Sequence, residues 1–396
     1  MFGVGLAFST VLRRSGAMHT QVMVTLFVCG DVMTGRGVDQ ILAHPCPPEI
    51  HESYVRDARE YVALAEEVNG PIARPVAAAY IWGDALQELE HVAPDARIIN
   101  LETSVTTSED FWRGKGIHYR MHPQNVTCLV AAGVDVCVLA NNHVLDYGRA
   151  GLEETIATLT EAGLKVAGAG ASIHDAREPA IIDLNNRGRI LVFAIGAENS
   201  GISRAWTATP VSSGIDLLRD FSDATAGELL DRVRRRKQRG DIAVVSLHWG
   251  DNWGYEVPDA HVRFAHRLLD GSVDLIHGHS SHHPRPIEIY RDKLVLYGCG
   301  DFINDYEGIT GYEEFRDDLA AMYFPRLDPD TGKLADLHLT PLRIRKMQLM
   351  RPSARERDWL RERLASVSRD FGCDVTVDPE DGALTVRRLV SSRPTT

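Results

Sequence analysis

The chain has 396 residues, of which 44% are hydrophobic and 25% are charged, and its formal net charge is −12. These values are typical of a globular protein with a full hydrophobic core, and they exclude a largely disordered chain. The acidic balance argues against a general nucleic-acid binder, because non-specific affinity for the phosphate backbone depends on positive surface charge.

The cysteines and the N-terminal segment bear on the compartment. The six cysteines form no CxxC pair, which excludes a zinc ribbon or a thioredoxin-like motif and favours a reducing environment. In residues 1–18 the apolar residues precede the two arginines, the reverse of the order in an export signal. No stretch reaches the roughly 18 apolar residues that span a bilayer. We therefore expect a cytoplasmic protein with no membrane partner, a flexible tail over residues 1–21, and either Met1 or Met18 as the initiator.

From residue 22 to residue 162 the chain alternates between short apolar runs and helix-like segments. Such runs are typical of strands that are buried on both faces. They predict strands at 22–29, 96–101 and 134–140. The intervening segments predict helices at 61–68, 81–91, 126–132 and 151–162, the first of them within a long proline-rich excursion at 44–75. This is the β-α-β alternation of an α/β protein.

The second half of the chain adds antiparallel pairs. Two polar turns predict hairpins, one pairing 180–184 with 190–195 and the other pairing 287–290 with 294–297. Further strands are predicted at 242–247, 273–276, 322–327, 337–349, 374–376 and 384–389, and helices at 224–239, 260–269 and 353–371. Strands that first alternate with helices and then pair with each other predict a layered α/β sandwich with a mixed sheet.

Polar side chains follow several of the predicted strands. In open α/β sheets ligands bind at the carboxyl ends of the strands, so these side chains are expected to converge. The clusters are Cys29-Gly30-Asp31, Asn100-Leu101-Glu102, Ala140-Asn141-Asn142-His143, Leu247-His248-Trp249 and the histidines of Ile276–Pro284. Each cluster alone is a weak signal, since Asp is a common turn former and a lone loop histidine is usually solvated. Four histidines within seven residues nevertheless indicate metal chemistry.

These clusters occur in the order of a known family. The segments that carry the likeness are Gly30 to Arg36, Asn100 to Glu102, Ala140 to Gly148, His248 to Gly250, and Gly278 to His282 continuing through Pro286 to Phe302. In them the chain resembles the CapA-type proteins of poly-γ-glutamate capsule biosynthesis, within the calcineurin-like metallophosphoesterase superfamily. The resemblance implies a calcineurin-like layered β-sandwich of mixed sheets flanked by helices. It implies a metal-binding catalytic domain over residues 22–310, with a C-terminal strand and helix extension, 311–396, packed on the same domain.

The resemblance also implies a metal centre, with three departures from the superfamily pattern, one of which is a terminal Gly-His-x-His run that is one residue longer here. Met33 stands where the pattern has a histidine, and Glu102 stands where a bridging Asp would be. A thioether is a poor ligand for hard divalent ions, so we expect one tightly held ion rather than two. Calcium, magnesium and manganese all suit an oxygen-rich site. The expected metal ligands are Asp31, Glu102, Asn142, His248 and His279.

Further residues are expected to move protons or to bind substrate. Inversion at a Cα carbon needs an acid and a base on opposite faces, and His–Asp pairs supply both near neutral pH. The expected catalytic residues are His143, Asp146, His248, His279, His282 and Asp301. The basic, glycine-rich run 114–120 suits a carboxylate such as a peptide C-terminus, although a solvated loop is the plainer alternative. The expected substrate-binding residues are Arg36, Lys115, His118, Arg120, Tyr147, Trp249, Trp253 and Tyr255.

Three functions fit this site. The favoured one is a metal-dependent epimerase that inverts a Cα centre of a ribosomal, lasso-type peptide, an activity of a soluble branch that the chain resembles. The second is a CapA-like role in poly-γ-glutamate capsule biosynthesis, which ranks lower because such proteins are usually membrane-anchored. The third is phosphoester hydrolysis, which the departures at Met33 and Glu102 weaken. Resemblance of fold does not choose among them, and the sequence leaves the substrate, the metal and the oligomeric state open.

Overall fold

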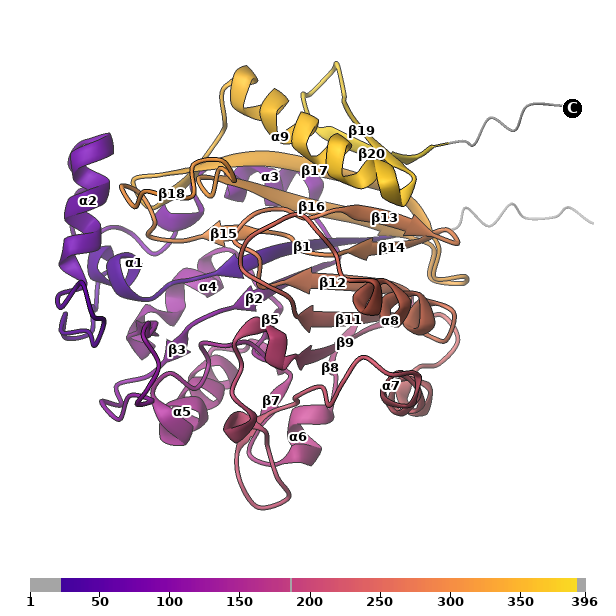
Figure 1. Cartoon of the computed structure of the whole chain (residues 1–396), viewed down its shortest axis with the longest axis horizontal. Coiled ribbons are helices and arrows are strands. Elements are labelled where there is room, and N and C mark those ends of the chain that lie inside the picture. The colour runs from indigo at the N-terminus through magenta and orange to yellow at the C-terminus, as the bar shows by residue number, and fades with distance from the viewer. Residues whose placement is uncertain (1–22, 186, 390–396) are drawn as a thin grey trace, which may run out of the picture.

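The computed structural model describes residues 23–185 and 187–389, so the tail expected at 1–21 lies outside the described residues. The described chain forms a layered β-sandwich of two mixed sheets with helices on its outer faces (Figure 1). This confirms the calcineurin-like architecture that the resemblance implied.

The larger sheet has ten strands and is built around β1 (Val24–Val32). On one side of β1 lie the parallel strands β2 (Ala96–Leu101), β5 (Val136–Val138) and β6 (Lys165–Ala167). On the other side lie, in antiparallel pairs, β16 (Leu319–Leu327), β17 (Leu334–Arg345), β20 (Leu384–Arg388) and β19 (Cys373–Val377). The short strands β15 (Asp301–Ile303) and β18 (Gln348–Met350) pair with β1 and β17. Strands from the C-terminal part of the chain therefore share a sheet with β1.

The smaller sheet has six strands in the order β13-β14-β12-β11-β9-β8. Its parallel part consists of β9 (Arg189–Gly196), β11 (Ile242–His248), β12 (Leu275–His279) and β14 (Lys293–Leu296). The edge strands β8 (Ala180–Asp183) and β13 (Ile287–Tyr290) pair antiparallel with β9 and β14. Both predicted hairpins are thus confirmed.

Alternation along the strands of the smaller sheet divides their side chains between two cores. Ile190 and Val192 of β9 lie in the main core between the sheets. Leu191 and Phe193 lie in a second core beneath α7 (Asp223–Arg236) and α8 (Asp259–Leu269). Because both faces of these strands are buried, their sequences are continuous apolar runs.

The remaining helices connect and cover the strands (Figure 1). They are α1 (Arg36–Ile41), α2 (Arg59–Asn69), α3 (Ala85–Val92), α4 (Thr127–Ala131), α5 (Gly148–Glu161), α6 (Ile173–Arg177) and α9 (Ala354–Ser368). Two small sheets pair β3 (Ser104–Val105) with β4 (Arg120–Met121), and β7 (Ala169–Gly170) with β10 (Gly214–Ile215). Among the helices of the described residues, none combines the length and the apolarity needed to cross a membrane.

Three local predictions are corrected by the structure. The helix predicted at 81–91 is split at Gly83, whose φ is 44° and where an added Cβ would lie 2.0 Å from the carbonyl oxygen of Leu349. The strand predicted to end at 276 continues to His279, so part of the histidine cluster lies within β12 itself. The strand predicted to end at 29 continues to Val32, so Gly30 lies inside β1. An added Cβ there would lie 1.6 Å from the carbonyl oxygen of Gly300, so tight packing between neighbouring backbones requires this glycine.

Candidate metal centre

The carboxyl ends of strands from both sheets meet in one buried region. Asp31 on β1 is the register partner of Asn100 on β2 and of Asp301 on β15. His248 at the end of β11 is the partner of His279 at the end of β12. Packing of the two sheets brings His279 Nδ1 to 4.0 Å from Asp31 Oδ1. Polar clusters that follow separate strands therefore converge, as expected for the carboxyl edge of parallel strands.

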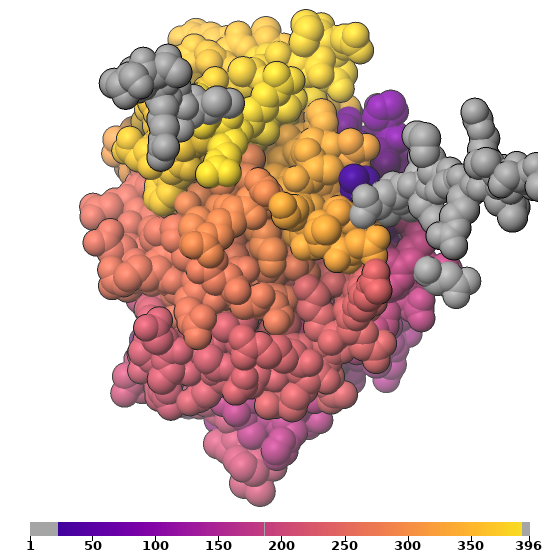
Figure 2. Space-filling view, turned by 90° about the vertical axis from the view of Figure 1, so that its right-hand side faces the viewer, coloured from indigo at the N-terminus to yellow at the C-terminus, as the bar shows by residue number. Residues whose placement is uncertain are grey.

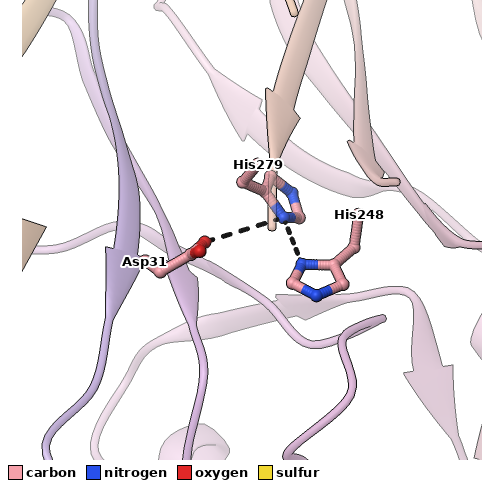
Figure 3. A group of neighbouring side chains, drawn as sticks. All are labelled: Asp31, His248 and His279. Atoms are coloured by element: carbon pink, nitrogen blue, oxygen red, sulfur yellow. Dashed lines mark hydrogen bonds and ion pairs between the residues drawn. The ribbon is translucent and has the colours of Figure 1, made fainter. Parts of the chain in front are cut away.

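The first candidate ligand group consists of Asp31, His248 and His279, and all three side chains are buried. Figure 3 shows the carboxylate and the two imidazoles pointing toward one another. His248 Nδ1 and His279 Nδ1 are 2.8 Å apart. One potential ligand atom from each residue lies within 4.8 Å of the others. Two ligand atoms that each lie about 2.0–2.6 Å from the same ion are separated by no more than twice that distance, so the observed spacing suits a shared ion.

The second group consists of Asp31, His282 and Asp301, and it is buried as well. His282 Nδ1 and Asp301 Oδ1 are 2.9 Å apart, and Asn304 donates from Nδ2 to Asp301 Oδ2 at 2.8 Å. Asp31 belongs to both groups, so the two possible ion positions are adjacent.

Glu102 and Asn142 border the first group. Asn100 donates from Nδ2 to Asp31 Oδ1 at 2.7 Å and to Glu102 Oε2 at 3.1 Å, which holds the two carboxylates side by side. Glu102 Oε2 is 3.9 Å from His248 Nδ1. The side-chain oxygen of Asn142 lies 3.1 Å from His248 Nε2. Glu102 therefore lies on the Nδ1 side of His248, which faces His279, whereas Asn142 contacts the opposite ring nitrogen, and ligation of an ion by either residue stays a prediction.

The carboxylates of this region are buried close to one another, which disfavours their charged forms. Burial and the neighbouring Asp301 raise the pKa of Asp31 to about 7, and burial, Asp31 and Asp301 raise the pKa of Glu102. Within the described part of the chain, the ion pairs of Asp31, Glu102 and Asp301 involve histidines only, with no Lys or Arg. Buried carboxylates are costly without a counter-charge. A divalent cation would supply that charge, so these residues fit a metal.

The two histidines of the first group are held in the neutral state that binds metals. Burial, reinforced by neighbouring histidines, lowers the pKa of both His248 and His279. Ser246 Oγ lies 2.7 Å from His279 Nε2 and 3.1 Å from His277 Nδ1. His277 Nε2 in turn lies 2.7 Å from the carbonyl oxygen of Cys29. His277 thus belongs to the layer behind the ligands, which orients them.

His143 lies beside the ligand groups rather than within them. Its Nδ1 is 2.6 Å from Asp146 Oδ2, and its Nε2 is 3.8 Å from Glu102 Oε1. Lys115 donates to the other oxygen of Asp146 and lies 2.9 Å from His143 Nδ1. Burial and the charge of Lys115 lower the pKa of His143 to about 4, against the opposing influence of Asp146. When Nδ1–H is donated to Asp146, Nε2 keeps a free lone pair and faces the centre as a proton acceptor.

Arg36, predicted to line the rim of a substrate pocket, is buried instead. It donates from Nη1 to Glu52 Oε1 at 3.1 Å, and from Nε and Nη2 to the carboxylate of Asp305. Its guanidinium carbon lies 3.8 Å from the ring centre of Tyr61. A guanidinium enclosed in this way has no free face for a substrate carboxylate, so the structure contradicts this prediction.

Four other predicted substrate-binding residues are also buried: His118, Arg120, Tyr147 and Trp249. Arg120 lies 4.7 Å over the ring of Tyr147 and donates to the carbonyl oxygen of Ser108 at 2.8 Å. Trp249 stacks on His261 with ring centres 4.6 Å apart. Gly114 and Gly116 of the run 114–120 are exposed, but its charged side chains turn inward, Lys115 to Asp146 and Arg120 to the carbonyl oxygen of Ser108.

The other three predicted substrate-binding residues lie closer to the centre. Lys115 supports Asp146, as described above. The ring of Trp253 is 5.1 Å from that of His282 and stacks on Tyr312 at 4.0 Å. Tyr255 contacts the ring of His283 at 4.5 Å. Substrate binding by Trp253 and Tyr255 stays a prediction.

Two tyrosines that the sequence patterns do not single out connect the histidines. The ring of Tyr119 lies 4.4 Å from that of His143, and the ring of Tyr306 lies 5.4 Å from that of His282. Their hydroxyl oxygens are 3.0 Å apart. Aromatic residues are common in cores, so no local signal distinguishes these two. By contrast, Asn100 sits in a cluster already marked by its position at a strand end.

The fold and the buried carboxylate–imidazole centre define a calcineurin-like protein equipped to bind metal. The family model of the bacterial capsule synthesis protein PGA_cap matches residues 25–306. The chain belongs to this family. The match includes every predicted metal ligand and every predicted catalytic residue.

Curated relatives extend the likeness over most of the chain. A probable polyglutamine synthesis accessory protein of Mycobacterium tuberculosis (strain H37Rv) is 48% identical over 360 residues, which cover 91% of this chain and 95% of the relative. The PGA biosynthesis protein CapA of Bacillus subtilis (strain 168) is 26% identical over 72% of this chain and 70% of its own length. The capsule biosynthesis protein CapA of Bacillus anthracis is 24% identical over 86% of this chain and 71% of its own length.

Proposed function

We propose that the protein is a metal-dependent accessory enzyme of glutamate-polymer synthesis that acts at the centre around Asp31. The observation that carries the proposal is the buried cluster of carboxylates and imidazoles, in which no Lys or Arg of the described residues pairs with Asp31, Glu102 or Asp301. Membership of the capsule synthesis family, and relatives named for PGA and polyglutamine synthesis, support this function over the epimerase that sequence reasoning ranked first. The substrate is then a peptide-like chain with free carboxylates.

One divalent ion would be held by Asp31, His248 and His279, with Glu102 and Asn142 beside it. A bound ion supplies a Lewis acid that polarises a carbonyl or phosphoryl oxygen. The group formed by Asp31, His282 and Asp301 offers a second, adjacent position that needs no ligand from residue 33. The expectation of a single ion therefore rests only on the unfavourable thioether of Met33, and metal stoichiometry tests it.

Protons at this centre would be moved by His143. Asp146 holds its Nδ1, so Nε2 accepts a proton from, or returns one to, a group bound next to Glu102. Lys115 balances the charge of Asp146 and thereby keeps that carboxylate ionised in a buried place. His282, held by Asp301, is the second histidine placed for this task when its position is free of metal.

We also place the protein in the cytoplasm as part of this proposal. All six cysteines are free thiols and all are buried. Unpaired cysteines of this kind are usual in reducing compartments. The location is tested in intact cells that contain a tagged copy of the protein, to which a membrane-impermeant labelling reagent is added. Labelling of the tagged protein without cell lysis would contradict a cytoplasmic location.

The function is tested with chelated protein reloaded separately with magnesium, manganese and calcium. Short γ-linked glutamate oligomers are incubated with each form and analysed by mass spectrometry. We expect a cation-dependent change in oligomer length or linkage that EDTA abolishes and that His143→Gln reduces. His91→Gln, an exposed change on α3, serves as the matched control and keeps wild-type turnover. Unchanged oligomers with all three metals would reject the enzymatic proposal.

Peptide epimerisation is the second candidate, favoured by one observation. Two buried His–Asp pairs, His143–Asp146 and His282–Asp301, lie at the same centre, as a two-base inversion requires. In D₂O such an enzyme places deuterium at the inverted Cα without changing connectivity. Release of phosphate from an aryl phosphate, with no deuterium in any peptide, would instead support the phosphoesterase alternative.

A further inference from the structure

A groove on the outside of the smaller sheet gathers arginines. It has a volume of about 670 Å³ and lies between α6 and α7, with Phe193 of β9 in its wall. This volume is in the range of ligand pockets. The residues around α6 and α7 form the lower part of the face shown in Figure 2. The basic residues that line the groove are His174, Arg177, Arg232, Arg235 and Arg236.

The sequence concentrates positive charge at this place. Six of the eight residues from 232 to 239 are Lys or Arg, in a chain whose net charge is −12. Basic residues in the last turn of a helix are favoured by the helix dipole, which accounts for some of them. The dipole of α7 does not account for the groove itself, nor for the arginine that α6 contributes to it, Arg177.

The acidic residues of the groove are already paired. The three ion pairs are Glu178 with Arg236 at 2.5 Å, Asp231 with Arg234 at 3.0 Å, and Glu228 with Arg219 at 3.1 Å. These pairs are exposed and roughly neutral as units. They therefore leave any additional arginine in the groove without an acidic partner.

Two sources of unbalanced positive charge remain. Arg177 and Arg232 share one buried carboxylate, Asp216, at 3.4 Å and 2.7 Å, so this trio carries an excess positive charge. Arg232 Nε is buried and has no hydrogen-bond partner. The side chain of Arg235 is exposed, and no hydrogen bond or ion pair joins that side chain to any residue that the structure describes.

We propose that the groove between α6 and α7 binds a polycarboxylate, and that its ligand is a stretch of the glutamate polymer held outside the metal centre. The identity of the polymer rests on the proposed function. Guanidinium groups bind carboxylates through paired N–H donors, and several along one groove hold successive carboxylates of a single chain. The groove lies toward the amino ends of β9 and β11, away from their carboxyl ends, so it would hold a distant stretch of a long chain while the end of that chain is processed at the centre.

The test measures binding of a fluorescently labelled γ-glutamate oligomer of about ten residues by fluorescence anisotropy at low salt in EDTA. EDTA removes any contribution from a metal-held chain. Arg235→Glu makes the charge of the groove more negative by two units. We therefore expect this variant to bind the oligomer about tenfold more weakly. The matched control is Arg263→Glu on α8, an exposed arginine outside the groove, which should change binding less than twofold.

Three outcomes would overturn the proposal. The first is absence of oligomer binding by the wild-type protein. The second is an equal loss of binding affinity in Arg235→Glu and Arg263→Glu. The third is displacement of the labelled oligomer by single-stranded DNA at a lower concentration than by unlabelled glutamate oligomer. Failure of the proposed function gives a different result. In that case metal-dependent turnover is absent while binding in EDTA persists, whereas failure of the groove proposal removes this binding and leaves turnover of short oligomers unchanged.

Discussion

Replacement of Arg36 by Met should destabilise the protein strongly. The arginine side chain is 1% exposed, and its partners Glu52 and Asp305 are 0% and 1% exposed. Met keeps much of the side-chain length but removes the charge, so two buried carboxylates lose their counter-ion. Removal of one partner from a buried ion pair typically costs about 3–5 kcal/mol, because the remaining charge is left uncompensated. We therefore expect the free energy of unfolding to fall by at least about 3 kcal/mol.

Urea denaturation followed by tryptophan fluorescence measures this change from the shift in midpoint at constant slope. The matched control is Arg326→Met, whose arginine is 51% exposed and lies 2.5 Å from Asp336. An exposed pair of this kind contributes about 0–1 kcal/mol. A loss for Arg36→Met no larger than that of the control would refute the reasoning. It would also restore Arg36 as a residue available to a substrate.

Three further predictions concern the metal, the proton and the pH dependence. Asp31→Asn, which alters a residue common to both ligand groups, should remove most of the bound divalent metal in elemental analysis, and wild-type stoichiometry would contradict the assignment. His143→Gln should lower turnover about 10²–10⁴-fold while metal content stays unchanged. Burial lowers the pKa of His261 to about 4, so its stabilising effect is complete above its unfolded value of about 6.5 and is lost as pH falls toward 4. His261→Phe, which keeps a ring against Trp249, should therefore reduce the fall in unfolding free energy between pH 7 and pH 5 by about 2 kcal/mol, and an identical pH dependence of both proteins would contradict this.

The strands buried on both faces were the most predictable part of the fold. The strand expected at 96–101 coincides with β2, and the one expected at 242–247 differs from β11 by a single residue. A continuous apolar run of this length indicates by itself that the strand is buried on both faces. The helix at 81–91 failed for the opposite reason, since the break at Gly83 is required by the backbone of β18, which comes much later in the chain.

The candidate site was predictable where it depended on strand ends. Asp31, Glu102, Asn142, His248 and His279 each follow or end a strand, and the carboxyl ends of parallel strands necessarily share an edge. The substrate-binding set was less predictable, because exposure of a charged residue is not a local property. Buried arginines look the same in sequence as solvated ones, and only remote carboxylates distinguish them.

The sequence by itself determined which elements form and which residue types stand at their ends, so that carboxylates gather at the edge of one sheet and imidazoles at the edge of the other, while packing of the two sheets decided that these edges meet. The tertiary structure alone decided the pairing of β15 with β1, which sets Asp301 beside Asp31 and creates the second ligand group. It also decided that Gly30 must lack a side chain and that Arg36 is enclosed. These outcomes depend on distances between segments far apart in the chain. Such distances follow from how the two sheets pack, and a local pattern of residues contains no information about them.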